Sequence, residues 1–275
     1  MNKLLRNCLL RSRIPLLCNV AIRSLRRRHA ERHGAFQAAL YPQLYPQGGS
    51  PRVLNGPFAG MLYLNESVWG SITPRWIGSY ESCLWHAVRE IISKRYSCII
   101  DVGCAEGYYA VGLCRAVPQA AVYAHDMDPY SLAQAERLWK LNGCPGTLQT
   151  GRRLDARQLN RLGQPGSLLI CDIEGGEMDL LDPFACAALL KMDLLIEVHR
   201  LGDKDATTNA AILRQRFAPT HDISSFDDTQ RVRQLAGVSA LDQATLDRAI
   251  SEGRPYAQVW LWVKCRRRPH GKETL

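Results

Sequence analysis

The chain has 275 residues, of which 46% are hydrophobic and 22% are charged, so it is long enough to bury a sizeable core and ordinary in composition for a globular protein. Its ten cysteines include no C-x-x-C pair, which argues against a zinc site and for reduced thiols in a cytoplasmic protein. The net charge of +9 lies at the two ends, which argues against a nucleic-acid enzyme with a basic face.

The basic ends are the first feature in chain order. Residues 1–34 carry nine Lys or Arg against Glu31, and residues 264–275 carry five against Glu273. They predict solvated ends or weak contacts with RNA or an anionic lipid surface. A mitochondrial presequence and an amphipathic surface helix both remain open for the first segment. Its longest uncharged run, residues 14–22, is too short to span a bilayer, so we expect no transmembrane segment.

The next segment is a lead-in, residues 35–94. Its first part, residues 35–60, is rich in Gly, Pro and Tyr and predicts loops. A helix follows up to Lys94, because apolar residues recur there at helical spacing. Tyr80 and Glu81 lie just before this helix and are candidates to line a substrate pocket, with simple packing as the alternative for Tyr80. We interpret the lead-in as a cap over the substrate side of the domain.

The stretch from residue 96 to residue 128 organises that domain. Residues 98–102 form an apolar run of the kind that is buried on both faces of a parallel sheet. Gly103, Ala105 and Gly107 then supply the small residues of a turn in which backbone approaches a ligand closely. A helix and a second short strand follow, so the stretch predicts a strand–turn–helix–strand unit.

Two acids flank this unit. Asp126 stands about 20 residues after the glycine turn, where a nucleoside ribose needs a carboxylate that accepts from both hydroxyls. Asp101 precedes the turn and gives it the form D-x-G-x-(G/A)-x-G, which does not fit the dinucleotide fingerprint G-x-G-x-x-G. A pyrophosphate-binding Rossmann domain and a glycine turn without a ligand remain open on this turn alone.

The rest of the chain alternates helices and strands. The expected helices are 129–141, 152–162 and 205–217, with a polar helical insertion through residue 251, and the expected strands are 147–150, 168–171, 192–198, 222–225 and 257–263. This alternation predicts an α/β fold with about seven strands in a mainly parallel sheet and helices on both faces. We place it in one domain, residues 95–264, followed by a basic tail, residues 265–275.

Acidic residues and a histidine follow two of the expected strands. Asp172, Glu174 and Glu177 come after one buried strand, and Glu197 and His199 end the next. Ligands of open α/β sheets bind outside the carboxyl ends of the strands, so these side chains are candidates for chemistry. A structural histidine and acids that favour a helix N-terminus are the alternatives.

Three segments together resemble the FkbM-like family of S-adenosylmethionine (SAM) methyltransferases: DVGCAEGYY at 101–109, CDIEGGEMDLL at 171–181 and IEVH at 196–199. The first has the form of the class I SAM methyltransferase turn, with Ala105 where glycine is commoner and Glu106 where the family usually has Asn. The resemblance implies a Rossmann-like class I methyltransferase fold. It also implies O-methylation, often of sugars or natural products.

The resemblance further implies how SAM would be held. Gly103, Ala105 and Gly107 would pass beneath its methionine part. Asp101 would orient the ammonium group directly or through water, and Asp126 would hold the ribose hydroxyls.

The adenine would lie against Met127, and Asp155 would reach its amine or stand as a helix acid on the surface. Asp172 would contact the SAM amino group or the acceptor.

Methyl transfer from SAM is an in-line displacement at carbon, and an alcohol acceptor must also lose its proton. His199 has the most suitable unperturbed pKa for the base, and Asp172 and Glu174 are the other catalytic candidates. Asp172, Glu197 and His199 would also suit Mg²⁺. The Asp-Asn pair of metal-dependent catechol-type enzymes is absent, however, so we predict no metal.

Two rival functions remain. An N- or RNA methyltransferase would use the basic ends, but the chain has Asp-Ile-Glu-Gly at 172–175 where base N-methylation would want (D/N)-P-P-(Y/F/W). A non-catalytic SAM- or nucleotide-binding module is the second rival. The sequence therefore predicts a SAM-dependent methyltransferase that acts on a hydroxyl of a small molecule or glycan.

Overall fold

The computed structural model describes residues 33–146, 148–227, 229, 231–232, 234–254 and 258–266. The basic N-terminal segment and the basic tail therefore lie almost entirely outside the described residues, and the predictions made for them stay predictions. Within the described ranges, no helix has the length and apolar character needed to cross a membrane.

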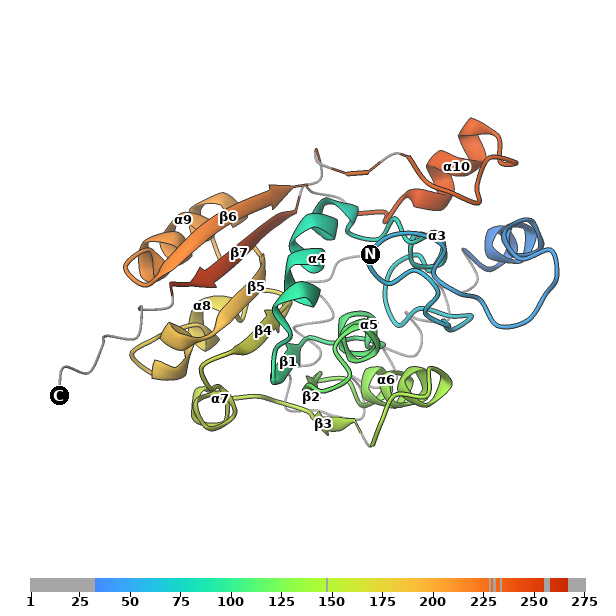
Figure 1. Ribbon diagram of the computed structural model, residues 1–275. Coiled ribbons are helices and arrows are strands. Elements are labelled where there is room, and N and C mark those ends of the chain that lie inside the picture. Colours follow the sequence, from blue (N-terminus) through green and yellow to red (C-terminus); the bar gives the residue numbers. More distant parts are fainter. Residues whose placement is uncertain are drawn as a thin grey trace, which may run out of the picture.

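A seven-stranded sheet forms the centre of the molecule (Figure 1). Its strands are β1 Cys98–Val102, β2 Ala121–His125, β3 Gln149–Gly151, β4 Ser167–Cys171, β5 Asp193–Val198, β6 His221–Asp227 and β7 Val259–Cys265, in the order β3-β2-β1-β4-β5-β7-β6. β1 to β5 are parallel, and β7 runs antiparallel to both β5 and β6. The predicted Rossmann-like class I methyltransferase fold, an α/β fold with a mainly parallel sheet, is confirmed.

Helices cover both faces of the sheet, as predicted (Figure 1). One face carries α4 Trp85–Lys94, α5 Tyr108–Ala116 and α6 Pro129–Leu141, and the other carries α7 Ala156–Leu162, α8 Glu177–Leu180 and α9 Ala206–Phe217. Ile99 and Ile100 are neighbours in β1 but belong to the two different cores, because successive side chains of a strand point to opposite faces. β1 and β4 lie at the point where the strand order reverses, which is where open α/β sheets bind ligands.

The lead-in differs from the loops expected over residues 35–60. Residues 33–44 form a helix that continues through Pro42. Leu40 and Leu44, four residues apart on one side of this helix, are buried in the core, and Tyr45 packs edge-on against Trp76. Burial of that apolar side outweighs the helix-breaking tendency of proline and the composition of the segment.

A short helix of the lead-in packs against a helix from near the end of the chain. α3 Thr73–Ile77 is buried throughout, and it packs against α10 Gln243–Ile250, where the Thr73 hydroxyl donates to the Ala249 carbonyl at 2.7 Å. A 3₁₀ turn, η1 Ser82–Leu84, leads into α4, and a second, η2 Ala187–Lys191, precedes β5. The division into lead-in and SAM-binding domain stays a prediction.

Most predicted boundaries are within two residues of the observed ones, but α7 begins four residues later than expected. Asp155 accepts a hydrogen bond from the backbone N–H of Gln158, and the Gln158 side chain accepts from the N–H of Asp155. This reciprocal cap fixes the start of the helix at Ala156, so the polar residues before it form a loop.

Candidate active site

The glycine turn is shaped by close backbone contacts. Gly103 has φ +86°, and a Cβ atom there would lie 1.7 Å from the carbonyl oxygen of Asp172, so only glycine fits. The N–H groups of Gly103 and Cys104 both donate to the His125 carbonyl, at 2.8 and 3.1 Å. Ala105 also has a positive φ, +48°, which explains why glycine would be the more comfortable residue there. The turn therefore joins the carboxyl ends of β1, β2 and β4.

Asp126 and Asp101 are both buried and both held by backbone N–H groups. Asp126 accepts from Ala105 at 3.0 Å through one oxygen and from Asp128 at 2.8 Å through the other. Asp101 accepts from the N–H of Ala110 in α5 at 3.0 Å. Burial, and to a smaller degree the neighbouring Asp126, raises the pKa of the Asp101 carboxyl to about 7, against the lowering effect of that hydrogen bond. A cation beside these two acids would restore the charged form of Asp101.

The other predicted cofactor residues are placed differently from one another. Gly107 has φ +88° and begins α5, and a Cβ there would lie 3.1 Å from the Cβ of Ala135 in α6. Met127 is 37% exposed directly after Asp126. Asp155 is exposed and its carboxylate caps α7. The structure thus gives Asp155 the surface role that was the alternative, and its contact with adenine stays a prediction.

A cleft lies over the glycine turn and the end of β4. Its floor consists of Gly103, Ala105, Asp172 and Glu174, and its roof consists of residues from the lead-in and from the segment before β7: Trp69, Gly70, Ser71, Arg75, Tyr80, Glu252 and Arg254. The structure therefore brings four of the predicted site residues together. It also places Tyr80 in the roof, where the lead-in was expected to act as a cap.

Arg254 is the centre of the roof, although nothing in the sequence marked it. Its guanidinium contacts Glu252 at 2.6 Å and Glu197 at 2.9 Å, and it also pairs with Glu81. Glu81 has a raised pKa because of its burial. These contacts join the end of β5 to the lead-in and to the chain before β7. Glu81 and Arg254 are 173 positions apart, so only the folded chain reveals the pair.

Glu106 anchors the lead-in to the glycine turn. Its side chain is fully buried, lies 2.9 Å from Nε of Arg75 and accepts from the hydroxyls of Tyr63 at 3.0 Å and Ser67 at 3.2 Å. Arg75 in turn lies 3.9 Å over the Tyr80 ring. The departure from the family's Asn therefore has a structural role here: a charged partner at this position meets the charge of Arg75.

His199 lies in a cluster of acids at the ends of β4 and β5. Its Nδ1 is 2.8 Å from Glu177, and its Nε2 is 3.4 to 3.6 Å from oxygens of Asp172, Glu174 and Glu197. Burial lowers the pKa of the imidazole, but the surrounding carboxylates outweigh this effect and hold it well above its usual value. In this arrangement the ring keeps its proton at neutral pH, which opposes the predicted role of His199 as the base.

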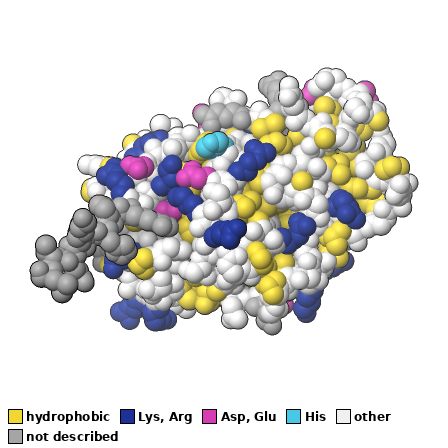
Figure 2. All heavy atoms as spheres, viewed as in Figure 1, with side chains coloured by type: hydrophobic (Ala, Val, Ile, Leu, Met, Phe, Trp, Pro, Cys, Tyr) yellow, Lys and Arg dark blue, Asp and Glu magenta, His cyan; other side chains and the backbone are white. Residues whose placement is uncertain are grey.

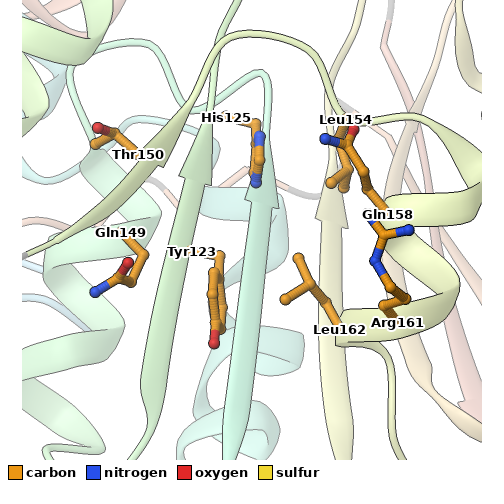
Figure 3. Close-up of a pocket in the computed structure, with 8 residues that line it drawn as sticks. All are labelled: Tyr123, His125, Gln149, Thr150, Leu154, Gln158, Arg161 and Leu162. Atoms are coloured by element: carbon orange, nitrogen blue, oxygen red, sulfur yellow. The ribbon is translucent and has the colours of Figure 1, made fainter.

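A second hollow of about 220 Å³ lies between β2, β3 and α7 (Figure 3). Side chains of Tyr123 and His125 from β2 and of Gln158 and Arg161 from α7 line it. It flanks the sheet and contains none of the predicted site residues. The cleft above the carboxyl ends of β1 and β4 is therefore the better candidate for the site.

Comparisons with known proteins give only distant structural likenesses. No family model matches the chain, and no curated protein matches it. Similar solved structures include a putative O-methyltransferase from Klebsiella pneumoniae, with 10% identity, a TM-score of 0.44 and coverage of 70% of this chain and 87% of that one. The O-methyltransferase TomG from Streptomyces achromogenes in complex with SAM has 13% identity, a TM-score of 0.41 and coverage of 67% and 80%.

An SAH-bound methyltransferase from Podospora anserina has 14% identity, a TM-score of 0.42 and coverage of 70% and 79%. Likeness at this level concerns the arrangement of the backbone, so the function of the chain has to be inferred from its own side chains.

Proposed function

We propose that the protein is a SAM-dependent methyltransferase that transfers a methyl group to a hydroxyl of a small molecule or sugar. One observation carries the proposal: a glycine turn that only glycine can make, with Asp126 bound to it, opens on the same cleft as Asp172 and Glu174. Cofactor and acceptor sites would therefore adjoin each other at the reversal of the strand order. The three FkbM-like segments, which supply the turn, Asp172 and Glu174, support the same family for the chain.

In this proposal the residues of the turn and of β2 hold the cofactor. Asp126 accepts from the ribose hydroxyls, since a carboxylate oxygen accepts more than one hydrogen bond. Met127 lies beside the adenine. The ammonium of SAM approaches Asp101, directly or through water, and stabilises its ionised form against the effect of burial. The sulfonium charge is what SAM itself supplies to activate the methyl group.

The acceptor lies toward the acid cluster. Asp172 and Glu174 are the groups of the cluster that line the cleft, so they are placed to orient a hydroxyl and to take its proton. Exclusion of water and alignment of the oxygen with the methyl carbon supply most of the rate. The roof, with Trp69 and Tyr80, contributes to selecting the acceptor.

The electrostatics favour a small acceptor over RNA. Figure 2 shows Lys and Arg dispersed over this face of the described chain, and not gathered in a stripe. A phosphate backbone is met by clustered basic side chains. The acids at the ends of β4 and β5 would repel it.

Calorimetry with SAM and with NAD tests the cofactor. We expect SAM to bind and NAD to fail to bind. Asp126→Ala should lower the affinity for SAM at least tenfold, while the exposed control Asp222→Asn should leave this affinity unchanged. Binding of NAD without SAM would contradict the proposal. A methyl-transfer screen against cell extract, resolved by mass, would then identify the acceptor and show whether oxygen or nitrogen receives the methyl group.

A further inference from the structure

We propose that Asp172, Glu174 and His199 bind one divalent metal ion at the acceptor end of the cleft, with the ligand preferences of Mn²⁺. The sequence predicted no metal, and the Mg²⁺ arrangement that it raised used Glu197. In the structure Glu197 pairs with Arg254 at 2.9 Å, and Glu174 takes its place in the donor set. Metal binding itself is independent of the proposed function, whereas the role of the metal in methyl transfer rests on it.

The donor atoms converge on one point. One oxygen each from Asp172 and Glu174 and a ring nitrogen of His199 all lie within 4.8 Å of one another. The contacts of Nε2, 3.6 Å to Asp172 and 3.4 Å to both Glu174 and Glu197, are longer than hydrogen bonds. Ligand atoms that share a metal at bond lengths of about 2.1 Å are separated by about 3.0 Å in an octahedron and about 3.4 Å in a tetrahedron. The spacing is therefore that of a coordination shell.

The orientation of the imidazole is the second observation. Its Nδ1 faces Glu177 at 2.8 Å, and Glu177 is itself fixed by the backbone N–H groups of Ile173 and Gly175. A metal-binding histidine commonly donates its other ring N–H to a carboxylate in this way. The Nε2 atom is buried, and among the described residues it makes no hydrogen bond. It faces oxygens of Asp172, Glu174 and Glu197 at 3.4 to 3.6 Å, and a metal ion would be bound by its lone pair on the side of Asp172 and Glu174.

The carboxylates of the cluster would be stabilised by a bound cation. Four carboxylates surround the one imidazole. Among the described residues, Arg254 pairs with Glu197 and is shared with Glu81 and Glu252. Like charges held together in a partly buried site are costly, and a divalent ion would remove that cost while taking the place of the ring proton.

The ligand types select among cations. Two carboxylates with one imidazole suit Mn²⁺, because Mg²⁺ prefers oxygen ligands and retains its waters. Three protein ligands leave open positions toward the cleft for an acceptor oxygen. A metal there acts as a Lewis acid and lowers the pKa of a bound hydroxyl. His199 would then be a ligand and not the base.

Mn²⁺ titration followed by electron paramagnetic resonance tests the site on the full chain without SAM. We expect one bound Mn²⁺ per chain, an affinity at least tenfold lower in His199→Ala and in Glu174→Gln, and no change in Asp222→Asn. Thermal melts with and without Mn²⁺ report folding, and the wild type, but not Glu174→Gln, should be stabilised by the ion.

Absence of a one-to-one Mn²⁺ complex, or equal affinity in the two site variants and the wild type, would overturn the proposal. Competition with Zn²⁺ and Mg²⁺ completes the titration, and displacement of Mn²⁺ by equimolar Mg²⁺ would contradict the ligand preference. SAM calorimetry on the same samples keeps this result apart from the proposed function. Loss of SAM binding with intact Mn²⁺ binding would overturn the methyltransferase alone.

Discussion

The two halves of the candidate site hold their carboxylates in different ways. On the side of the glycine turn, Asp101, Asp126 and Asp128 accept hydrogen bonds from backbone N–H groups of the turn, of α5 and of the start of α6. On the side of β4 and β5, Glu197 meets the guanidinium of Arg254, and Glu177 meets the imidazole of His199. One half is fixed by backbone geometry and the other by charge balance across distant segments.

The two halves should therefore be sensitive to different kinds of substitution. The turn side depends on backbone conformation, so substitutions that add a side chain should damage it most. The strand-end side depends on a balance of buried charges, so loss of one partner should leave the others uncompensated. Substitutions in each half can test this difference, from the largest expected effect to the smallest.

Gly103→Ala should have the largest effect. Its Cβ would collide with the Asp172 carbonyl in a backbone region that alanine disfavours, so we expect a loss of about 4 kcal/mol or more in the free energy of unfolding. Gly166→Ala is the matched control, because φ is +83° there and nothing lies within 4 Å of the added atom. Urea denaturation measures both, and an equal cost in the two variants would show that the clash is relieved.

Arg254→Met should destabilise the protein by about 3 to 5 kcal/mol, because it leaves buried carboxylates without their cation. The Arg254 side chain is only 11% exposed. The control is Arg137→Met, whose partner Glu66 lies 4.0 Å away at the surface, with an expected change of about 0.5 kcal/mol or less. Guanidinium chloride is unsuitable as the denaturant for comparing variants that differ in charge, so urea should be used. A loss for Arg254 as small as that of the control would contradict the charge-balance account.

Asp101→Asn should stabilise the protein without SAM at pH 8 by about 2 to 4 kcal/mol and have little effect at pH 4. The folded pKa of about 7 lies above the unfolded value, so the native state binds more protons between these values. The contribution of Asp101 to stability is therefore present at low pH and is lost as the pH rises through 7. Asn retains an oxygen for the N–H of Ala110. A pH-independent difference would contradict a raised pKa.

Substitutions of Asp155 should have the smallest effect on stability. Asp155→Ala removes the cap of α7 and should cost about 1 kcal/mol of stability, whereas Asp155→Ser keeps a capping oxygen and should cost little. Because Ser lacks the carboxylate, this second variant isolates the predicted contact with adenine. If that contact forms, SAM affinity falls in Asp155→Ser while thermal stability stays unchanged. An unchanged affinity would leave Asp155 as a cap only.

The sequence was sufficient for the features that depend on near neighbours. Apolar runs predicted β1, β4 and β5, and small residues predicted the turn after β1, in which Gly103 has a positive φ. These elements follow from residue spacing and hydrogen bonds within a few positions. The helix at 33–44 was missed because its stability comes from burial against Trp76 and the core, and not from its own composition.

The protonation and ion pairing of the charged residues in the site could not be predicted from residue spacing. His199 was a reasonable base by its unperturbed pKa, yet the carboxylates that raise its pKa come from β5, from α8 and from the loop after β4. Arg254 and Glu106 gained their roles from partners far away in the chain. Residue spacing was enough to predict the alternation of strands and helices and the glycine turn, because both are marked by residue types close together in the sequence. Only the tertiary structure decided the protonation and pairing of the acids, because these depend on which charges folding brings together out of water.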